Sequence, residues 1–284
     1  HSGRKVSLVL NKEIRVFADF CGPKRRVRKI IGEIMEISTD VPVRISYDEA
    51  TVTGSSLSIS FPELYQYVKH GTEIALDDGK MLLTVDRIEE KDIVCKVTRG
   101  GVLLNEKGVN VIDTDLPIPS FTDKDEQDAL FALSEGFDAV ALSFVKRKED
   151  ILYLQEFLKK HTDKNIPIIA KIETKSALHE MEGILSVVDM IMVARGDLGI
   201  ELPVQKIPLI QKELLCVGKA AGVPVIVATE ILKSMTQNPF PTRAEITDCI
   251  DALIDGASFL MLSDETTTGK YPSEAVIIMS SVIQ

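Results

Sequence analysis

The sequence predicts an α/β fold: an incomplete TIM-type (β/α) barrel with a second, small β domain inserted into it. Two observations predict this. From Asp123 onward, short apolar segments alternate with amphipathic helical segments, whereas residues 28–118 show the alternation and turn residues of antiparallel strands. At 284 residues, 45% of them apolar, the chain can bury one large core or two smaller ones. We therefore assign residues 1–27 and 119–284 to the barrel and residues 28–118 to the insertion.

The predicted barrel strands are short apolar segments. The first is residues 14–19, IRVFAD, which ends at Asp19 and precedes a Gly-Pro pair. Five more follow the insertion: residues 138–144, 167–173, 188–194, 223–229 and 258–263. Between them lie segments with apolar residues at helical spacing, such as residues 148–160, and this alternation is typical of parallel βαβ units. Six strands do not close an eight-stranded barrel, so open edges have to be covered, paired or exposed.

The insertion is predicted to be mostly antiparallel. The segment IALDDGKMLLTVD places Asp78-Gly79 between two alternating stretches, which indicates a hairpin. The segments VPVRISYD, LSISF and DIVCKVTR are also short and alternating. Pro117 and Pro119 mark the return to the barrel.

Composition excludes several classes of function. A net charge of −10 argues against a broad nucleic-acid surface, and no apolar run approaches the ~20 residues of a membrane span. The four cysteines are far apart and form no CxxC pair, which favours a reduced, cytoplasmic protein over a disulfide scaffold or zinc site. The four histidines show no ligand or catalytic spacing. Because the chain opens HSGRK without Met, we expect it to be a fragment of a longer protein.

Charged residues occur at the carboxyl ends of two neighbouring predicted strands. Lys171 and Glu173 are two residues apart, so they share one face of their strand, at the end where barrels carry active sites. The next strand ends in ARGDLG, which supplies Asp197 and glycine amides that could face an anion. Two carboxylates from adjacent strands suit Mg²⁺ or Mn²⁺. The alternatives are a buried structural ion pair, and a glycine turn with an aspartate helix cap.

Three further features are less specific. Thr229 and Ser263 end two later strands, and helix capping would explain either hydroxyl. The basic run GPKRRVRK, which includes Lys24 and Arg26, is either a solvated face or, beside the strand-end Asp19, a site for phosphates.

Several stretches together resemble one family. PIIAKIETKSAL, MVARGDLGIELP, ATEILKSMTQNPFPTRAEITD and MLSDETTTGKYPSEAV, in this order, are similar to pyruvate kinase, as are LDDGKMLL, GGVLLNEKGVN and LPIPSFTDKD. The resemblance runs from about residue 14 to the end of the chain. It implies transfer of a phosphoryl group from phosphoenolpyruvate to ADP, giving pyruvate and ATP, as a step of glycolysis in the cytoplasm. It also implies a homo-oligomer in the full-length form.

The resemblance assigns roles to residues of the barrel. Lys171 corresponds to the catalytic lysine, which neutralises charge on the phosphoryl group in flight. Glu173 and Asp197 correspond to the Mg²⁺ ligands. The amides of Gly196 and Asp197 and the hydroxyl of Thr229 would hold the substrate carboxylate.

Further roles concern the proton and the nucleotide. Thr229 and Ser263 would belong to the network that delivers a proton to the enolate carbon. Arg26 and Lys107 match positions that contact the phosphates of ADP or ATP. The inserted small β-barrel domain would close over the site as a lid and exclude water.

The sequence also departs from the family pattern. Residues 19–24 read DFCGPK where the family usually has Asp-Thr-Lys-Gly-Pro-Glu, so Lys24 replaces a glutamate beside the K⁺ site that includes Asp19. Because an ammonium there can supply the monovalent charge, we expect activity to require Mg²⁺ but not K⁺. Asp264 replaces a usual glycine and Glu230 a usual glutamine, which adds negative charge near the site.

Two family segments have no counterpart in the sequence: the first two barrel strands with the motif Arg-x-Asn-x-Ser-His-Gly, and the C-terminal domain. We expect a fragment rather than a reduced protein that self-associates. Three functions therefore compete: a pyruvate kinase or its core, a non-catalytic relative that binds metal and nucleotide, and a metal-dependent aldolase on a phosphoenolpyruvate-type barrel. Arg26, Lys107 and the insertion favour a protein that uses nucleotides over the aldolase.

Overall fold

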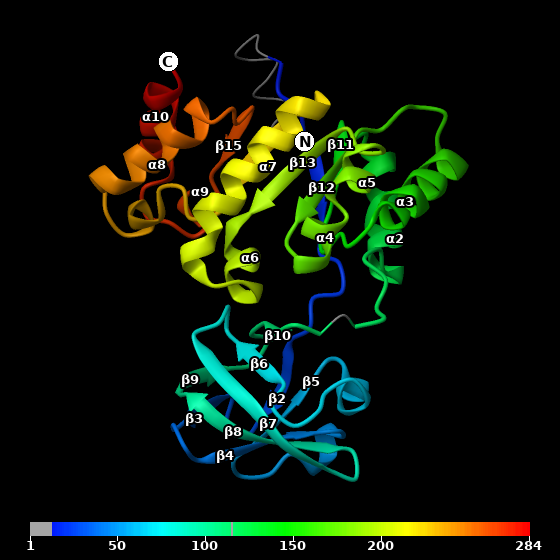
Figure 1. The fold of residues 1–284 in the computed structure, drawn as a ribbon, viewed down its shortest axis with the longest axis vertical. Helices are drawn as coiled ribbons and strands as arrows, with labels where there is room; N and C mark the ends of the chain where they lie inside the picture. The colour runs from blue at the N-terminus through cyan, green and yellow to red at the C-terminus, as the bar shows by residue number, and fades with distance from the viewer. Residues whose placement is uncertain (1–12, 115) are drawn as a thin grey trace. The chain divides into compact units, whose positions relative to one another are not determined.

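The structure, a computed structural model, describes residues 13–114 and 116–284 (Figure 1). The chain divides into two compact units. Unit 1 comprises His1–Pro23, Pro119–Leu198 and Gln205–Gln284. Unit 2 comprises Lys24–Ile118 and Gly199–Val204.

Unit 1 contains a six-stranded parallel sheet in the order β1-β11-β12-β13-β14-β15. Its strands are β1 (Phe17–Phe20), β11 (Ala139–Leu142), β12 (Ile168–Ile172), β13 (Met190–Ala194), β14 (Val225–Ala228) and β15 (Phe259–Met261). All six predicted segments form strands, and the fold class is confirmed. The observed strands are shorter than predicted. Glu173 and Thr229 lie just past the ends of β12 and β14, and Thr229 leaves the ladder with a φ of 66°.

Helices connect and cover these strands (Figure 1), and they belong to unit 1 apart from residues 199–204, which the division places in unit 2. They are α2 (Asp123–Ser134), α3 (Lys148–His161), α4 (Lys175–His179), α5 (Met181–Leu185), α6 (Arg195–Glu201), α7 (Ile207–Ala221), α8 (Arg243–Ile254), α9 (Asp264–Thr267) and α10 (Pro272–Ile283), with short 3₁₀ turns at Val204–Lys206 and Lys233–Thr236. Helix α3 occupies the segment that the helical spacing predicted. Helices α2 and α8 begin at the capping boxes of Thr122 and Thr242, which satisfy amides that a helix N-terminus leaves unpaired.

The two end strands of this sheet are more exposed than the four between them. β11, β12, β13 and β14 are almost entirely buried, whereas Phe259 in β15 is 52% exposed and Phe17 in β1 is 37% exposed. A cavity of about 370 Å³ near the amino ends of the strands is lined by Phe17, Phe259 and interior residues such as Ile169. Within the described residues, the sheet therefore remains open between β1 and β15.

Unit 2 is built around a seven-stranded sheet in the order β10-β6-β7-β8-β4-β5-β2, with a separate β3-β9 pair. The strands are β2 (Val27–Ile30), β3 (Ile34–Ile37), β4 (Pro42–Ser46), β5 (Ser56–Ile59), β6 (Glu73–Leu76), β7 (Met81–Glu89), β8 (Asp92–Arg99), β9 (Gly101–Leu104) and β10 (Val109–Val111), with 3₁₀ turns at Glu49–Thr51 and Pro62–Gln66. An isolated antiparallel bridge joins Arg26 to Gly108, next to β2 and β10. The amide of Val27 also donates to the carbonyl of Lys107 at 2.8 Å. These contacts connect the two end strands and close the sheet into a small barrel.

The predicted hairpin of unit 2 is confirmed. β6 and β7 pair antiparallel around a turn in which Asp77, Asp78 and Gly79 have φ of 49°, 54° and 80°. Asp, Asn and Gly tolerate such positive φ values best. The Asp-Gly pair therefore predicts this turn from the sequence alone. Alternate side chains of these two strands, such as Leu76 and Leu83, lie on one face of the pair and enter one buried core.

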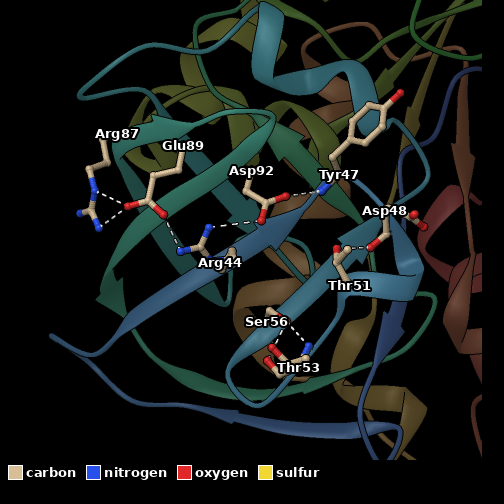
Figure 2. Close-up of polar contacts among 9 residues, drawn as sticks. All are labelled: Arg44, Tyr47, Asp48, Thr51, Thr53, Ser56, Arg87, Glu89 and Asp92. Atoms are coloured by element: carbon tan, nitrogen blue, oxygen red, sulfur yellow. Dashed lines mark hydrogen bonds and ion pairs between the residues drawn. The ribbon is translucent and has the colours of Figure 1, made fainter.

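Several charged residues of unit 2 pair with one another (Figure 2). The guanidinium of Arg44 pairs with Glu89 at 2.5 Å and with Asp92 at 3.2 Å. Glu89 also pairs with Arg87, and Asp92 accepts a hydrogen bond from the amide of Tyr47 at 2.8 Å. We call Arg44, Arg87, Glu89 and Asp92 the Arg44 cluster. Its members lie at the solvent boundary, with the Arg44 side chain 39% exposed.

No helix in the described ranges is long and apolar enough to span a membrane. All four cysteines are free; Cys95 and Cys249 are buried, and Cys21 and Cys216 are exposed.

Candidate active site

The centre of the candidate site is the amine of Lys171, near the carboxyl end of β12. Its Nζ donates to the Ser143 hydroxyl at 2.8 Å and to Asp19 Oδ1 at 3.1 Å, and it lies 3.2 Å from Glu173 Oε1. Asp19 comes from β1, and Ser143 directly follows β11. Because β1, β11 and β12 are neighbours in parallel register, their carboxyl ends bring these side chains together. The Ser143 hydroxyl in turn donates to the carbonyl of Phe20 at 2.6 Å.

Lys171 is a largely buried cation, with its side chain 14% exposed. Burial by itself would lower the pKa of Lys171, but the negative charges of Glu173 and Asp19 outweigh it and hold that pKa above its ordinary value. The amine is therefore an ammonium at any physiological pH. Its charge is fixed in place by three oxygen partners before any ligand arrives.

Glu173 is the most deeply buried carboxylate of the site, with its side chain 1% exposed. Its Oε2 accepts a hydrogen bond from the amide of Phe144 at 2.7 Å, and Phe144 turns this amide inward from a left-handed φ of 53°. Burial and, to a smaller degree, the charge of Asp197 raise the pKa of Glu173 to about 7, against the opposing effect of Lys171. Two carboxylates that repel each other in a buried site favour a cation between them.

Asp197 and Gly196 lie in the first turn of α6, which starts where β13 ends. The amide of Gly196 donates to the Thr229 hydroxyl at 2.9 Å. Thr229 and Glu230 both have left-handed backbones, with φ of 66° and 54°. The structure thus joins the end of β13 to the end of β14, and the predicted residues Gly196 and Thr229 lie in direct contact.

Ser263 lies after β15 and precedes α9. Its amide donates to Glu265 Oε2 at 2.8 Å, and the buried Glu265 also accepts from the amide of Leu232 at 3.3 Å. The neighbouring Asp264, one of the two added negative charges, pairs with the amine of Lys233. Its charge is therefore compensated within the protein.

Three predicted residues lie in unit 2. Arg26 donates through Nη1 to the carbonyl of Glu106 at 2.8 Å, and Lys107 pairs with Asp77 at 3.1 Å. Burial would raise the pKa of Asp77, but Lys80 and Lys107 hold it below its usual range. Arg26 and Lys107 therefore come together where the small barrel closes. Lys24 is the first residue of unit 2, whereas Asp19, placed by sequence in the same monovalent-cation region, is a partner of Lys171.

Three groups at these strand ends were not predicted from the sequence: Ser143, the Phe144 amide and Arg195. Ser143 had a signal, because it is a polar residue at the end of the predicted strand 138–144, as Thr229 is in its own segment. The Phe144 amide had none, since any residue type supplies a backbone donor. Arg195 was visible in ARGD, but its partners lie on three other segments of the chain.

Comparisons with known proteins agree on one family. The family model for the barrel domain of pyruvate kinase matches residues 2–276. Pyruvate kinase 2 of Synechocystis sp. is 39% identical over 285 residues, covering 99% of this chain and 48% of that protein. The pyruvate kinase of Clostridium acetobutylicum is 39% identical over 290 residues, covering 100% of this chain and 61% of that protein.

A solved structure agrees as well. The crystal structure of a pyruvate kinase from Cryptosporidium parvum matches with a TM-score of 0.92 and 34% identity, covering 98% of this chain and 58% of that one. The chain thus spans about half to three fifths of the length of these relatives.

Proposed function

The chain belongs to the pyruvate kinase family, and on this premise we propose that unit 1 carries the centre for phosphoryl transfer from phosphoenolpyruvate to ADP, which gives pyruvate and ATP. The observation that carries the proposal is the Lys171 ammonium, held by Asp19, Ser143 and Glu173 at the carboxyl ends of three neighbouring strands. Phosphoryl transfer depends on positioning and on neutralising charge, and a fixed ammonium supplies both.

The roles of the surrounding groups follow from their chemistry. Lys171 would neutralise the oxygens of the phosphoryl group as it leaves phosphoenolpyruvate. The Thr229 hydroxyl and the Gly196 and Asp197 amides would orient the substrate carboxylate. Thr229 and Ser263 would belong to the relay that brings a proton to the enolate carbon, which turns it into the methyl group of pyruvate.

The residues present fit a divalent cation. Glu173 and Asp197 offer oxygen ligands, and their mutual repulsion in a buried site would be relieved by a positive ion. No group of three or more His, Cys, Asp or Glu residues in the described ranges could hold a metal. The protein would therefore supply few ligands and leave positions for substrate and water, as suits Mg²⁺ or Mn²⁺. When bound, such an ion supplies positive charge to the phosphoryl oxygens.

The nucleotide is assigned to unit 2. Arg26 and Lys107 would contact the phosphates of ADP and ATP. Their guanidinium and ammonium groups lie near the bridge between Arg26 and Gly108 that closes the small barrel. Binding would compete with their present partners, the Glu106 carbonyl and Asp77.

The test is a coupled assay for pyruvate with phosphoenolpyruvate, ADP and Mg²⁺. We expect Lys171→Met to lower turnover by on the order of 10³-fold or more, because it removes charge stabilisation from the transition state. The matched control is Lys212→Met, which removes another ion-paired lysine of unit 1 at the surface. Equal activity in parent and Lys171→Met would refute the assignment. Mn²⁺ binding by a parent without turnover would instead support a non-catalytic binding protein.

We also propose that K⁺ is not required, because Lys24 stands where the family usually has a glutamate. The measurement is turnover in KCl against tetramethylammonium chloride at equal ionic strength. We expect equal rates in the two salts. A large stimulation by KCl would refute this part of the proposal and leave the role of Lys171 untouched.

A further inference from the structure

The guanidinium of Arg195 connects the loop after β14 to two helices. Arg195 is the first residue of α6, and its side chain is 10% exposed. Its Nε and Nη2 donate to the Thr229 carbonyl at 3.1 and 2.7 Å, and Nη2 also donates to the Glu230 carbonyl at 2.9 Å. Its Nη1 contacts Gln211 of α7 at 3.3 Å and both carboxylate oxygens of Asp248 of α8, at 2.9 and 2.6 Å.

These contacts engage the whole guanidinium. An arginine has five N–H donors in a fixed planar arrangement, and here protein oxygens accept from Nε, Nη1 and Nη2. Its donors are therefore used to hold the protein, which argues against a role in binding substrate. Because the fork is planar, fixing Nη1 on Asp248 also fixes where Nε and Nη2 point.

The loop that Arg195 holds has an unfavourable backbone. Thr229 and Glu230 have consecutive φ values of 66° and 54°. A left-handed conformation is a genuine outlier for a β-branched residue and persists only where the surroundings enforce it. Thr229 is held from both sides by consecutive residues, since Arg195 binds its carbonyl and the Gly196 amide binds its hydroxyl.

We propose that Arg195, anchored by Asp248 and Gln211, is a positioning residue that keeps Thr229 left-handed and its hydroxyl aligned with the Gly196 amide. The effect on turnover rests on the proposed function, in which Thr229 contacts the substrate. The effect on the conformation of Thr229 does not.

The conformation is tested by NMR of threonine methyl groups in the full chain, with the Thr229 signal assigned by its loss in Thr229→Ser. We expect Arg195→Met to shift or broaden this signal, and Asp248→Asn to do so less. The matched control is Asp255→Asn, because Asp255 pairs with Lys212 and so also connects α7 to the end of α8 without contacting Thr229. It should leave the signal in place. An unmoved Thr229 signal in a folded Arg195→Met overturns the proposal.

Turnover gives an independent readout. We expect Arg195→Met to lower kcat by about 10–100-fold while the KM for ADP changes little, because small misplacements near reacting groups cost rates of this order. Arg195→Lys should recover only part of the loss, since a lysine lacks the fork. Adding Thr229→Ala to Arg195→Met should cost less than Thr229→Ala costs alone, because both act through the same group. Fully additive losses would overturn the proposal.

If circular dichroism shows that Arg195→Met does not fold, Asp248→Asn and Arg195→Lys decide the question by the same methyl signal. If the parent chain has no turnover, the proposed function fails. The methyl signal still decides whether Arg195 positions Thr229.

Discussion

The two sheets of this molecule differ in how they end. The sheet of unit 2 closes through the bridge between Arg26 and Gly108, so that its end strands β2 and β10 are joined. The sheet of unit 1 ends at β1 and β15 without such a junction in the described residues, and Phe259 remains half-exposed there. Closure removes the unpaired backbone N–H and C=O groups that the edges of an open sheet present. The small barrel therefore leaves fewer such groups unpaired than the described sheet of unit 1 does.

The units also differ in where they keep their charges. Unit 1 buries Lys171, Glu173 and Glu265 at the carboxyl ends of its apolar strands. Unit 2 buries the carboxylate of Asp77 but keeps the Arg44 cluster at the solvent boundary, where water shares the solvation of its members. Burying a charge is costly unless it is paired and hydrogen-bonded. Unit 1 therefore gives up stability at the place where we propose that its chemistry lies.

The largest effect should come from the core of the closed barrel. Leu83 in β7 is fully buried, so Leu83→Ala should destabilise unit 2 by about 2–5 kcal/mol. Phe259→Ala at the open edge of unit 1 should cost far less, because that ring is already half in water. Native-state hydrogen exchange of amides in β7 and β14 measures each unit separately, since a chain with two units need not unfold in one step. Comparable losses for the two variants would show that the closed core of unit 2 contributes no more stability than the open edge of unit 1.

A second effect distinguishes a buried from an exposed carboxylate. Glu173 and Glu89 both pair with a cation, but only Glu173 lies beside Asp197 in a buried site. We expect Glu173→Gln to weaken Mn²⁺ binding by roughly 10–100-fold, which is the scale of losing an interaction at a metal site. Calorimetric titration with Mn²⁺ measures it, and Glu89→Gln is the control that should not change it. Unchanged affinity in Glu173→Gln would exclude this carboxylate from the proposed metal site.

The course of each sheet was predictable, because its signal is local. The six barrel strands are short apolar segments between helical ones, and the hairpin of unit 2 follows from Asp78-Gly79. The predicted strands extended past the observed carboxyl ends of β12 and β14. At Thr229 the reason is that side-chain type does not reveal a left-handed backbone. Thr229 is β-branched, a residue type that favours strands, so the sequence predicts that the strand continues through it. Its left-handed backbone instead places it outside β14.

The candidate site was predictable only in part. Lys171 and Glu173 could be placed together because strand periodicity puts residues two apart on one face. Asp19 lies 152 positions from Lys171 and Ser143 lies 28 positions away, and nothing local links them. Family resemblance placed Asp19 in a cation site without indicating that its carboxylate would pair with the lysine. Contacts of this kind depend on strand order, which the chain specifies only once it is folded.

A third, smaller effect concerns pH. In unit 1, Glu245 accepts hydrogen bonds from Ser234 and Thr242, from the amide of each at 2.7 Å. Burial would raise the pKa of Glu245, but these hydrogen bonds hold it below its usual range. A carboxyl whose pKa is lower in the folded state stabilises the fold above its unfolded pKa, and this is lost as the pH falls through the folded one. Glu245→Gln should therefore cost about 1 kcal/mol at neutral pH, typical of a helix cap, and progressively less in acid.

Asp77 gives the matched measurement in unit 2. The pKa of Asp77 is also lowered, but by Lys80 and Lys107 rather than by a helix cap, with burial opposing the shift. Asp77→Asn should show the same loss of effect in acid, and added salt should diminish it, because ion pairs are screened. Urea titrations at low and high NaCl, followed in each unit separately by hydrogen exchange in β6 and in α8, measure this. Equal salt sensitivity in Glu245→Gln and Asp77→Asn would contradict the assigned causes.

The smallest effect should come from the Arg44 cluster. Arg44 is partly exposed and its partners lie at the solvent boundary, so water already replaces much of what each pair provides (Figure 2). Arg44→Ala should therefore destabilise unit 2 less than Leu83→Ala does, and the small loss should disappear in 1 M NaCl. The measurement is hydrogen exchange of amides in β4 and β8, which pair beside this residue. A loss as large as that of Leu83→Ala would mean that charge on its outer face, rather than the closed apolar core, holds the small barrel together.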